Sequence, residues 1–152
     1  MATNWRATAV LMALCISSSL AACEAVAQSL PKEVATRAEI SPIPSLTLSD
    51  QQFLSGDAAA GKPVTVAGEF RVAQGSGKLP VVVLMHGSSG VGATTEAWVH
   101  AFNAMGISTF VIDGFSGRGL TVVGPNQALL GRLNLIVDIY RSLEILAKHP
   151  RV

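Results

Sequence analysis

The feature that most constrains the fold is an uninterrupted apolar run at residues 80–85 (PVVVLM), enclosed between two glycine-containing segments. The run is too short for a typical helix, and its three consecutive valines favour an extended backbone. Because apolar residues do not alternate with polar ones, the run predicts a strand that is buried on both faces. Such a strand belongs in a sheet covered by helices, which predicts an α/β fold.

Strands and helices are predicted to alternate around this run. Residues 64–72 alternate enough to predict a strand, which we expect to pair antiparallel at one side of the sheet. Residues 94–105 predict a helix, residues 107–112 a strand rich in β-branched side chains, and residues 126–149 a long helix. This order predicts right-handed crossovers and a mostly parallel, doubly wound sheet.

The apolar positions of the two predicted helices define the faces expected to point into the core. On the first helix these are Trp98, Phe102 and Met105. On the second they are Leu129, Leu133, Ile136, Val137, Tyr140 and Leu143.

Composition and charge limit the class of protein. The 152 residues support one domain at most, and 11 Lys+Arg against 10 Asp+Glu give a net charge of +1. A nucleic-acid binder would need a basic face, so that class is excluded. A hydrophobic content of 49% with 14% charged residues excludes a disordered chain.

The first 22 residues have the order of a bacterial secretory signal, with Arg6, an apolar run at 7–16 and then small residues. The apolar run would cover about half of a ~30 Å hydrocarbon core, so we expect a cleaved signal peptide. Leu20–Cys23 (LAAC) resembles a lipobox, in which Cys23 would be lipidated, whereas Ala25–Ala27 (AVA) fits ordinary signal peptidase. The first site predicts a membrane-anchored lipoprotein and the second a soluble periplasmic protein, and the spacing favours the lipobox.

Residues 23–62 are predicted to be an extended leader or tether, because they contain Pro31, Pro42 and Pro44 among scattered polar residues. A short edge strand is expected near Ser45–Leu48, and the folded domain is expected to cover residues 63–152. The two cysteines, Cys15 and Cys23, precede the domain, which is therefore expected to hold no disulfide.

The loop after the apolar run, residues 86–92 (HGSSGVG), carries the main chemical signal. Its three glycines allow a sharp turn that leaves backbone N–H groups pointing outward. In open α/β sheets, sites form where strands end at their carboxyl edge. Fixed N–H donors at that edge suit the stabilisation of a developing oxyanion.

A strand ending in His-Gly before such a loop resembles the first oxyanion-hole element of α/β-hydrolases, and more narrowly the dienelactone hydrolase family. The matching pieces are residues 79–91 (LPVVVLMHGSSGV), Trp98, residues 105–119 (MGISTFVIDGFSGRG) and residues 138–152 (DIYRSLEILAKHPRV). The resemblance covers roughly residues 60–152 and implies an ester, lactone or thioester hydrolase that works through an acyl-enzyme.

The resemblance implies roles for the residues of this loop. The backbone N–H of Ser88 would be an oxyanion donor, and Gly87 would leave room for the substrate carbonyl. His86 is a candidate base, but the resemblance favours a role in orienting the loop. The hydroxyls of Ser88 and Ser89 are expected to hold the loop, since neither residue lies in a G-x-S-x-G motif.

Four polar residues outside the loop are also candidates for a role. Arg118 has two possible roles, and a structural role is expected for each of the other three. Arg118 either binds a substrate carboxylate, as an arginine does in lactone-cleaving members of the family, or pairs with Asp113 or caps a helix. Asp113 is expected to fix its loop by accepting hydrogen bonds. His100 and His149 are expected to be surface or helix-capping residues.

No serine or cysteine has glycine at both −2 and +2, although Ser116 has Gly114 before it. The resemblance therefore implies that the nucleophile, acid and base lie beyond residue 152, and that this chain alone is inactive. No cofactor or metal-ligand motif is found, so no cofactor is expected. Without the strand that would carry the nucleophile, the valine-rich run is expected to keep an open edge that favours self-association.

Two other readings compete with this hydrolase fragment. One is a non-catalytic envelope lipoprotein that uses the α/β domain as a binding module. The other is an obligate pair with a separately encoded second half.

Overall fold

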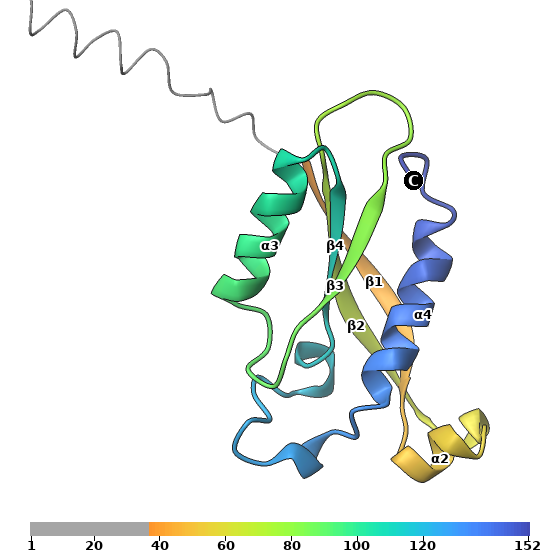
Figure 1. The fold of residues 1–152 in the computed structure, drawn as a ribbon. Helices are drawn as coiled ribbons and strands as arrows, with labels where there is room; N and C mark the ends of the chain where they lie inside the picture. The colour runs from red at the N-terminus through yellow and green to blue at the C-terminus, as the bar shows by residue number, and fades with distance from the viewer. Residues whose placement is uncertain (1–36) are drawn as a thin grey trace, which may run out of the picture. The chain divides into compact units, whose positions relative to one another are not determined.

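The computed structural model describes residues 37–152, which build a four-stranded sheet in the order β1-β2-β4-β3 (Figure 1). The strands are β1 Arg37–Thr47, β2 Lys62–Val72, β3 Val81–Met85 and β4 Ser108–Asp113. β1 pairs antiparallel with β2, β2 pairs antiparallel with β4, and β3 pairs parallel with β4. The predicted signal peptide, Cys23 and the Ala25–Ala27 site lie outside the described residues.

The α/β fold is confirmed, but the prediction of a mostly parallel sheet is wrong for the described strands. Only the β3–β4 pair is parallel, because β1 and β2 form a long antiparallel ribbon along one side. β1 also differs from the tether expected for residues 23–62. It is an 11-residue edge strand in which buried Ile43 and Ser45 alternate with exposed Pro42 and Pro44. Prolines fit an edge strand because its outer backbone groups need no partner in the sheet.

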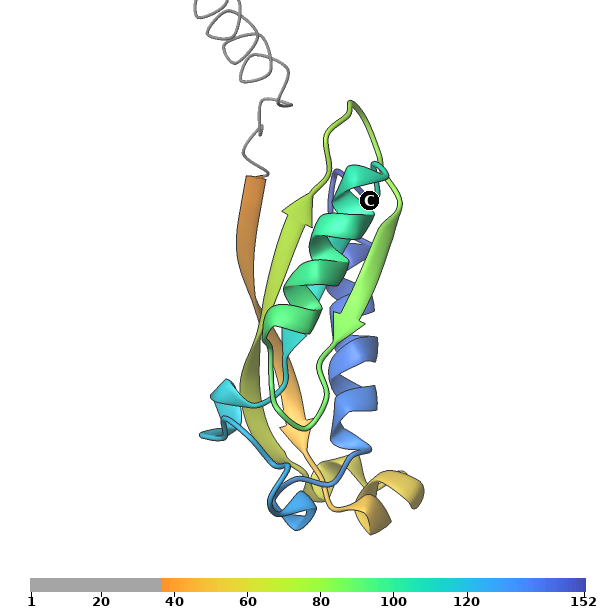
Figure 2. The same ribbon diagram turned by 60° about the vertical axis from the view of Figure 1, so that its left-hand side comes forward.

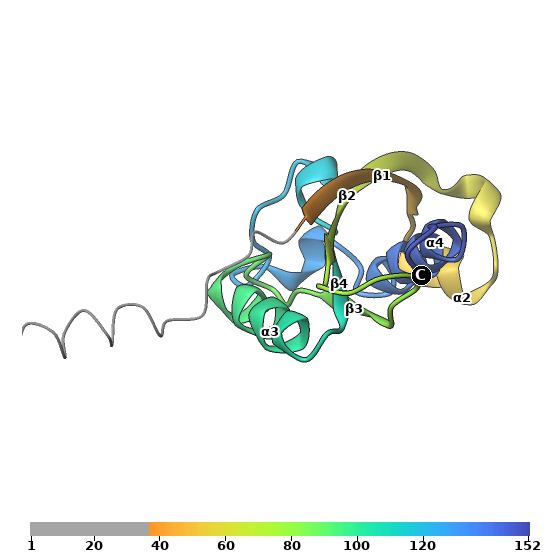
Figure 3. The ribbon, with the colours of Figure 1, turned by 90° about the horizontal axis from the view of Figure 1, so that it is seen from above.

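Two helices cover the sheet on opposite faces, as Figures 1 and 3 show. α3 (Ala93–Ala104) connects β3 to β4, and α4 (Asn134–Leu146) follows a long loop after β4. The remaining helical segments are short: α2 Asp50–Leu54, η1 Ala58–Ala60, η2 Ser116–Arg118 and η3 Gln127–Leu129. Among residues 37–152, no helix combines the length and apolar character needed to span a membrane.

The main core lies between the sheet and α4. It joins side chains of β1, β2 and β4 with Leu146, and Val81, Val83 and Met85 of β3 pack against it. β4 is one of the two inner strands and is almost wholly buried, with Phe110 at 1% and Ile112 at 0% exposure. A methyl group on Gly68 of β2 would lie 2.2 Å from the Phe110 ring, so only glycine fits at this crossing.

The predicted inward face of α3 is wrong, although the helix itself lies within one residue of its predicted bounds. Val99 is the buried residue of α3, whereas Trp98 is 56% exposed and Met105 is also exposed. Trp98 stacks on Phe102 one turn later, with ring centroids 5.7 Å apart. Phe102 is partly buried, and the exposed Trp98 ring packs on it along the surface of the helix.

The predicted long helix and its apolar stripe are also corrected. Residues 127–129 form a separate helical turn, and α4 begins only after Gly131. A Cβ at Gly131 would lie 2.5 Å from a carboxylate oxygen of Asp50, so the chain passes too close to α2 for a helical side chain. The buried residues of α4 are mostly polar: Asn134, Asp138, Ser142 and Leu146. The residues that the stripe predicted as buried but that are exposed are Leu129, Ile136, Tyr140 and Leu143.

The strand predicted from residues 80–85 is the other edge of the described sheet. Each residue of β3 is partly buried, rather than fully buried on both faces as the apolar run predicted. Figure 2 shows the outer side of this strand free of any neighbouring strand within the described residues.

Candidate functional site

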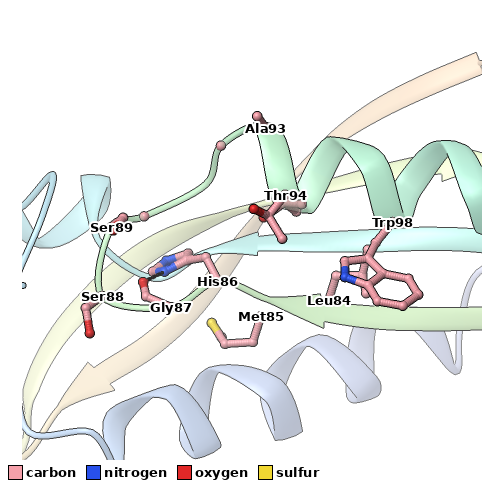
Figure 4. A pocket seen from close by; sticks show the side chains of 12 residues that line it. Leu84, Met85, His86, Gly87, Ser88, Ser89, Ala93, Thr94 and Trp98 are labelled. Carbon is pink, nitrogen blue, oxygen red and sulfur yellow. Dashed lines mark hydrogen bonds between the residues drawn. The ribbon is translucent and has the colours of Figure 1, made fainter.

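The loop that follows β3 borders a cavity of about 470 Å³ at the carboxyl end of the strand (Figure 4). The cavity extends from Ser88 to Trp98, and Figure 4 shows the Trp98 ring beside Leu84. Its lining holds no lysine, arginine, aspartate or glutamate: Leu84, Met85, His86, Gly87, Ser88, Ser89, Gly90, Gly92, Ala93, Thr94, Thr95 and Trp98. A cavity with this lining suits an uncharged group.

The imidazole of His86 is buried, and both of its nitrogens bind the backbone. The Gly114 N–H donates to Nε2 at 3.1 Å, so Nε2 carries a lone pair and no proton. Nδ1 lies 2.8 Å from the Gly87 carbonyl oxygen, to which it donates the remaining proton. The Phe115 ring packs against the imidazole with centroids 4.3 Å apart. These contacts describe a neutral histidine that holds the loop and has no free nitrogen to act as a base.

The carbonyl of Gly87 determines where the next amide points. This oxygen accepts from His86 Nδ1 and from the Gly90 N–H at 3.1 Å, so it faces the inside of the bend. The described chain holds no cis peptide, and in a trans peptide the N–H points opposite to the C=O. The Ser88 N–H therefore points out of the bend, and no acceptor for it is found among residues 37–152. The bend therefore presents one backbone donor that no other described residue uses.

Contacts around Ser88 and Gly90 keep the bend in place. The Val123 N–H donates to the Ser88 carbonyl oxygen at 2.9 Å, and Gln127 Nε2 donates to Ser88 Oγ at 2.9 Å. Gly90 has φ of 78°, a left-handed conformation, and a Cβ there would lie 2.8 Å from the Thr121 carbonyl oxygen. The loop expected from three glycines is thus present, and the Ser88 hydroxyl helps to hold it.

Asp113 ends β4 and fixes the next turn through its carboxylate. Its Oδ1 accepts the N–H groups of Phe115 at 2.9 Å and Ser116 at 3.0 Å. Burial by itself raises the pKa of Asp113, but hydrogen bonds from Ser116 and Phe115 outweigh burial, and the net pKa is below its usual value. The expectation that Asp113 fixes its loop is confirmed.

Arg118 is buried beneath this turn and pairs with Asp138 of α4 rather than with Asp113. Nη1 and Nη2 donate to the two Asp138 oxygens at 2.7 and 3.0 Å, and the two side chains are 3% and 0% exposed. The other donors bind the Gly114 carbonyl at 2.7 Å, the Leu46 carbonyl at 2.9 Å and Thr47 Oγ1 at 3.0 Å. All five N–H groups of the guanidinium are thereby occupied. The geometry favours the structural reading of Arg118 over a substrate carboxylate ligand.

The other two histidines lie away from the loop. His100 is exposed on α3, and His149 contacts Glu39 at 3.2 Å and the Phe70 ring, which ties the end of α4 to β1 and β2. In the part of the chain that the structure describes, no serine hydroxyl pairs with a histidine nitrogen. The same residues contain no cluster of histidine, cysteine and carboxylate side chains able to hold a metal ion.

Sequence reasoning missed the partners of Arg118. Asp138 accepts a further hydrogen bond from Ser45 Oγ at 2.5 Å, and Asn134 exchanges two hydrogen bonds with the backbone of Leu48. The available signal was the spacing of Asn134, Asp138 and Ser142, which places three polar residues on one helix face. The predicted apolar stripe placed a different face of this helix in the core, so these polar residues were not singled out.

Comparison with protein-family models, with curated proteins and with solved structures gives no match.

Proposed function

We propose that this chain supplies the oxyanion-hole portion of an exported ester or lactone hydrolase of the dienelactone hydrolase type. The observation that carries the proposal is the Ser88 N–H, which points out of a fixed bend at the edge of an uncharged cavity. The order of the motifs in residues 79–152 supports the same family.

In the proposed reaction, a serine or cysteine from outside the described residues attacks the carbonyl carbon of a bound ester. The carbonyl oxygen gains negative charge as the tetrahedral intermediate forms, and the Ser88 N–H donates a hydrogen bond to it. Re-forming the carbonyl breaks the bond to the alcohol oxygen, which takes up the proton that the nucleophile lost and leaves behind the acyl-enzyme. Water then attacks the acyl-enzyme, releases the acid and returns a proton to the nucleophile. His86 holds the loop during this cycle and transfers no proton.

The open edge of β3 is where the nucleophile would be delivered. The Leu79 N–H, just before β3, donates to the Arg151 carbonyl oxygen at 2.9 Å, so the chain at residue 151 already runs beside the beginning of β3. A parallel strand along β3 would end at the same sheet edge as the 86–92 loop. A nucleophile directly after such a strand would lie near Ser88. If this edge stays uncovered, we expect copies of the chain to associate through it.

A comparison of the chain with a longer product tests the proposal. The 152-residue chain should form no acyl-enzyme with p-nitrophenyl acetate, as judged by intact mass. The product extended by the downstream coding sequence should be acylated at a serine or cysteine outside residues 37–152. Acylation of a serine within residues 37–152 would contradict the proposal, and an extended product that is never acylated would favour a non-catalytic binding module.

Two substitutions at one position test the backbone donor in the extended product. Ser88→Pro removes the N–H, whereas Ser88→Ala keeps it and changes only the side chain. We expect kcat to fall about 10²–10³-fold further in the proline variant than in the alanine variant. Equal activity of the two folded variants would show that the Ser88 N–H is not an oxyanion donor.

A further inference from the structure

We propose that Arg118 and Asp138 are positioning residues that set the direction of the Ser88 N–H through Gly114 and His86. This role rests on the proposed function, because it concerns the geometry of the same oxyanion site. It replaces the substrate-binding role that the family resemblance implied for Arg118. The path is continuous, with hydrogen bonds of 2.7–3.1 Å between Arg118 and the bend.

The first step is the attachment of Arg118 to three parts of the fold. Its guanidinium binds Asp138 of α4, the Leu46 and Thr47 end of β1, and the Gly114 carbonyl after β4. Because the group is buried, every one of these bonds replaces water that cannot enter, and the guanidinium has a single favourable placement. The position of Gly114 is therefore fixed relative to α4 and β1.

The second step passes through Gly114 itself. Its carbonyl accepts from Arg118 Nη1 at 2.7 Å, while its N–H donates to His86 Nε2 at 3.1 Å. A Cβ on Gly114 would lie 2.8 Å from Leu135 Cδ2, 3.2 Å from Asp138 Oδ2 and 3.7 Å from His86 Nε2. This residue thus sits between the ion pair and the imidazole, with no room for a side chain.

The third step is the tautomer of His86. An N–H donated to Nε2 forces the proton onto Nδ1, and Nδ1 can then donate to the Gly87 carbonyl at 2.8 Å. With the opposite tautomer, Nδ1 would present a lone pair to that carbonyl oxygen and repel it. The Gly87–Ser88 peptide would lose the contact that keeps its carbonyl inside the bend and its N–H outside.

The test is NMR on the full 152-residue chain carrying Arg118→Lys, with Arg71→Lys as the matched control. A lysine keeps the charge but cannot reach Asp138, Leu46 and Gly114 together. We expect Arg118→Lys to accelerate exchange of the Gly114 amide about tenfold. It should also move the His86 ring-nitrogen signals away from the pure Nδ1–H form and shift the Ser88 amide signal. Arg71 pairs with Glu96 and Glu69 on the α3 side, so its variant should leave these signals unchanged.

A folded Arg118→Lys chain whose His86 tautomer and Ser88 amide are unchanged would overturn the proposal. If Arg118 had a purely structural role, Arg118→Lys would lower the stability without moving the His86 and Ser88 signals. These signals therefore distinguish a positioning role from a structural one.

If Arg118→Lys does not fold, native-state hydrogen exchange of the unchanged chain tests the same positioning role. The Gly114 N–H and the Arg118 Nε–H should then open together, with the same dependence on denaturant. Separate openings would overturn the proposal. None of these measurements uses catalysis, so failure of the proposed hydrolase function leaves their outcome readable.

Discussion

Arg71 and Arg118 bind carboxylates on opposite faces of the same sheet, in very different surroundings. Arg71 of β2 pairs with Glu96 of α3 at 2.6 and 3.0 Å, and the side chains are 20% and 40% exposed. Hydrogen bonds from the guanidinium to Glu69 and Glu96 raise the pKa of Arg71. Arg118 and Asp138 are closed to water, and the remaining donors of Arg118 bind the backbone and Thr47.

The difference shows how burial changes what an ion pair does. Near the surface, water can replace either partner, so the pair adds little to the stability of the fold and does little to fix the positions of its neighbours. In the interior, an unmatched donor or charge is costly, so every group around Arg118 must keep its place. The buried pair therefore determines the geometry of the Gly114 turn, whereas the Arg71 pair lies at the edge of the contact between β2 and α3 and determines no geometry there.

The largest effect is expected from breaking the buried pair. Asp138→Ala leaves the Arg118 charge without a partner and should lower the free energy of unfolding by about 3–5 kcal/mol. Urea denaturation followed by circular dichroism measures this loss. Glu96→Ala is the matched control on the other face and should lose less than about 1 kcal/mol. Similar losses in the two variants would remove the distinction between the pairs.

The next effect concerns the space between the buried pair and His86. Gly114→Ala forces a methyl group against Leu135 and Asp138 and should lower the free energy of unfolding by about 1–3 kcal/mol. Gly87→Ala is the matched control, because nothing lies within 4 Å of its Cβ position, and we expect a change within about 0.5 kcal/mol. A Gly114→Ala chain as stable as the parent would mean that the turn has room to move.

Low pH should lower the stability of the turn above Arg118 through protonation of Asp113. Because the pKa of Asp113 is lowered in the folded chain, the carboxylate stabilises the fold above the ordinary aspartate pKa of about 3.9. This contribution is lost as the pH falls through the lowered folded-state value. Asp113→Asn removes the titration, so its unfolding free energy should fall less steeply between about pH 4 and pH 2. Parallel pH curves for the parent and the variant would contradict this assignment.

The smallest effect is expected at the exposed pair. A double-mutant cycle with Arg71→Met and Glu96→Gln should give a coupling energy of about 0.2–1 kcal/mol that decreases in high salt. Thermal unfolding at two salt concentrations is sufficient for this measurement. A coupling energy above about 2 kcal/mol that does not change with salt would show that the Arg71 pair behaves like the buried Arg118 pair.

The elements that sequence patterns predicted well are those governed by local chemistry. The alternation of Val66, Phe70 and Val72 gave β2, and β-branched residues gave β4 within one residue. The His-Gly loop was found because few residue types allow a tight bend at the end of a strand. The same glycines predicted backbone N–H groups that point outward, whereas the choice of the Ser88 N–H came from the family resemblance.

The errors arose where distant residues decide the structure. Because of Pro42 and Pro44, the segment was interpreted as a tether with only a short edge strand near Ser45–Leu48. The edge strand is present but longer, because its pairing with β2 tolerates prolines at an edge. α4 was oriented by its apolar stripe, but its inward face carries Asp138 and Asn134, which bind Arg118 and the backbone of Leu48. No local pattern shows which arginine a carboxylate 20 residues away will meet.

The bend leaves the Ser88 N–H without an acceptor, whereas the amides around it are hydrogen-bonded. Amide hydrogen exchange of the full chain, resolved residue by residue by NMR, distinguishes these two kinds of amide. We expect fast exchange at Ser88, together with marked protection of the Gly90 and Gly114 amides that donate to Gly87 and His86. A Ser88 amide as protected as that of Gly90 would contradict this expectation, because the donor would then be occupied inside the fold.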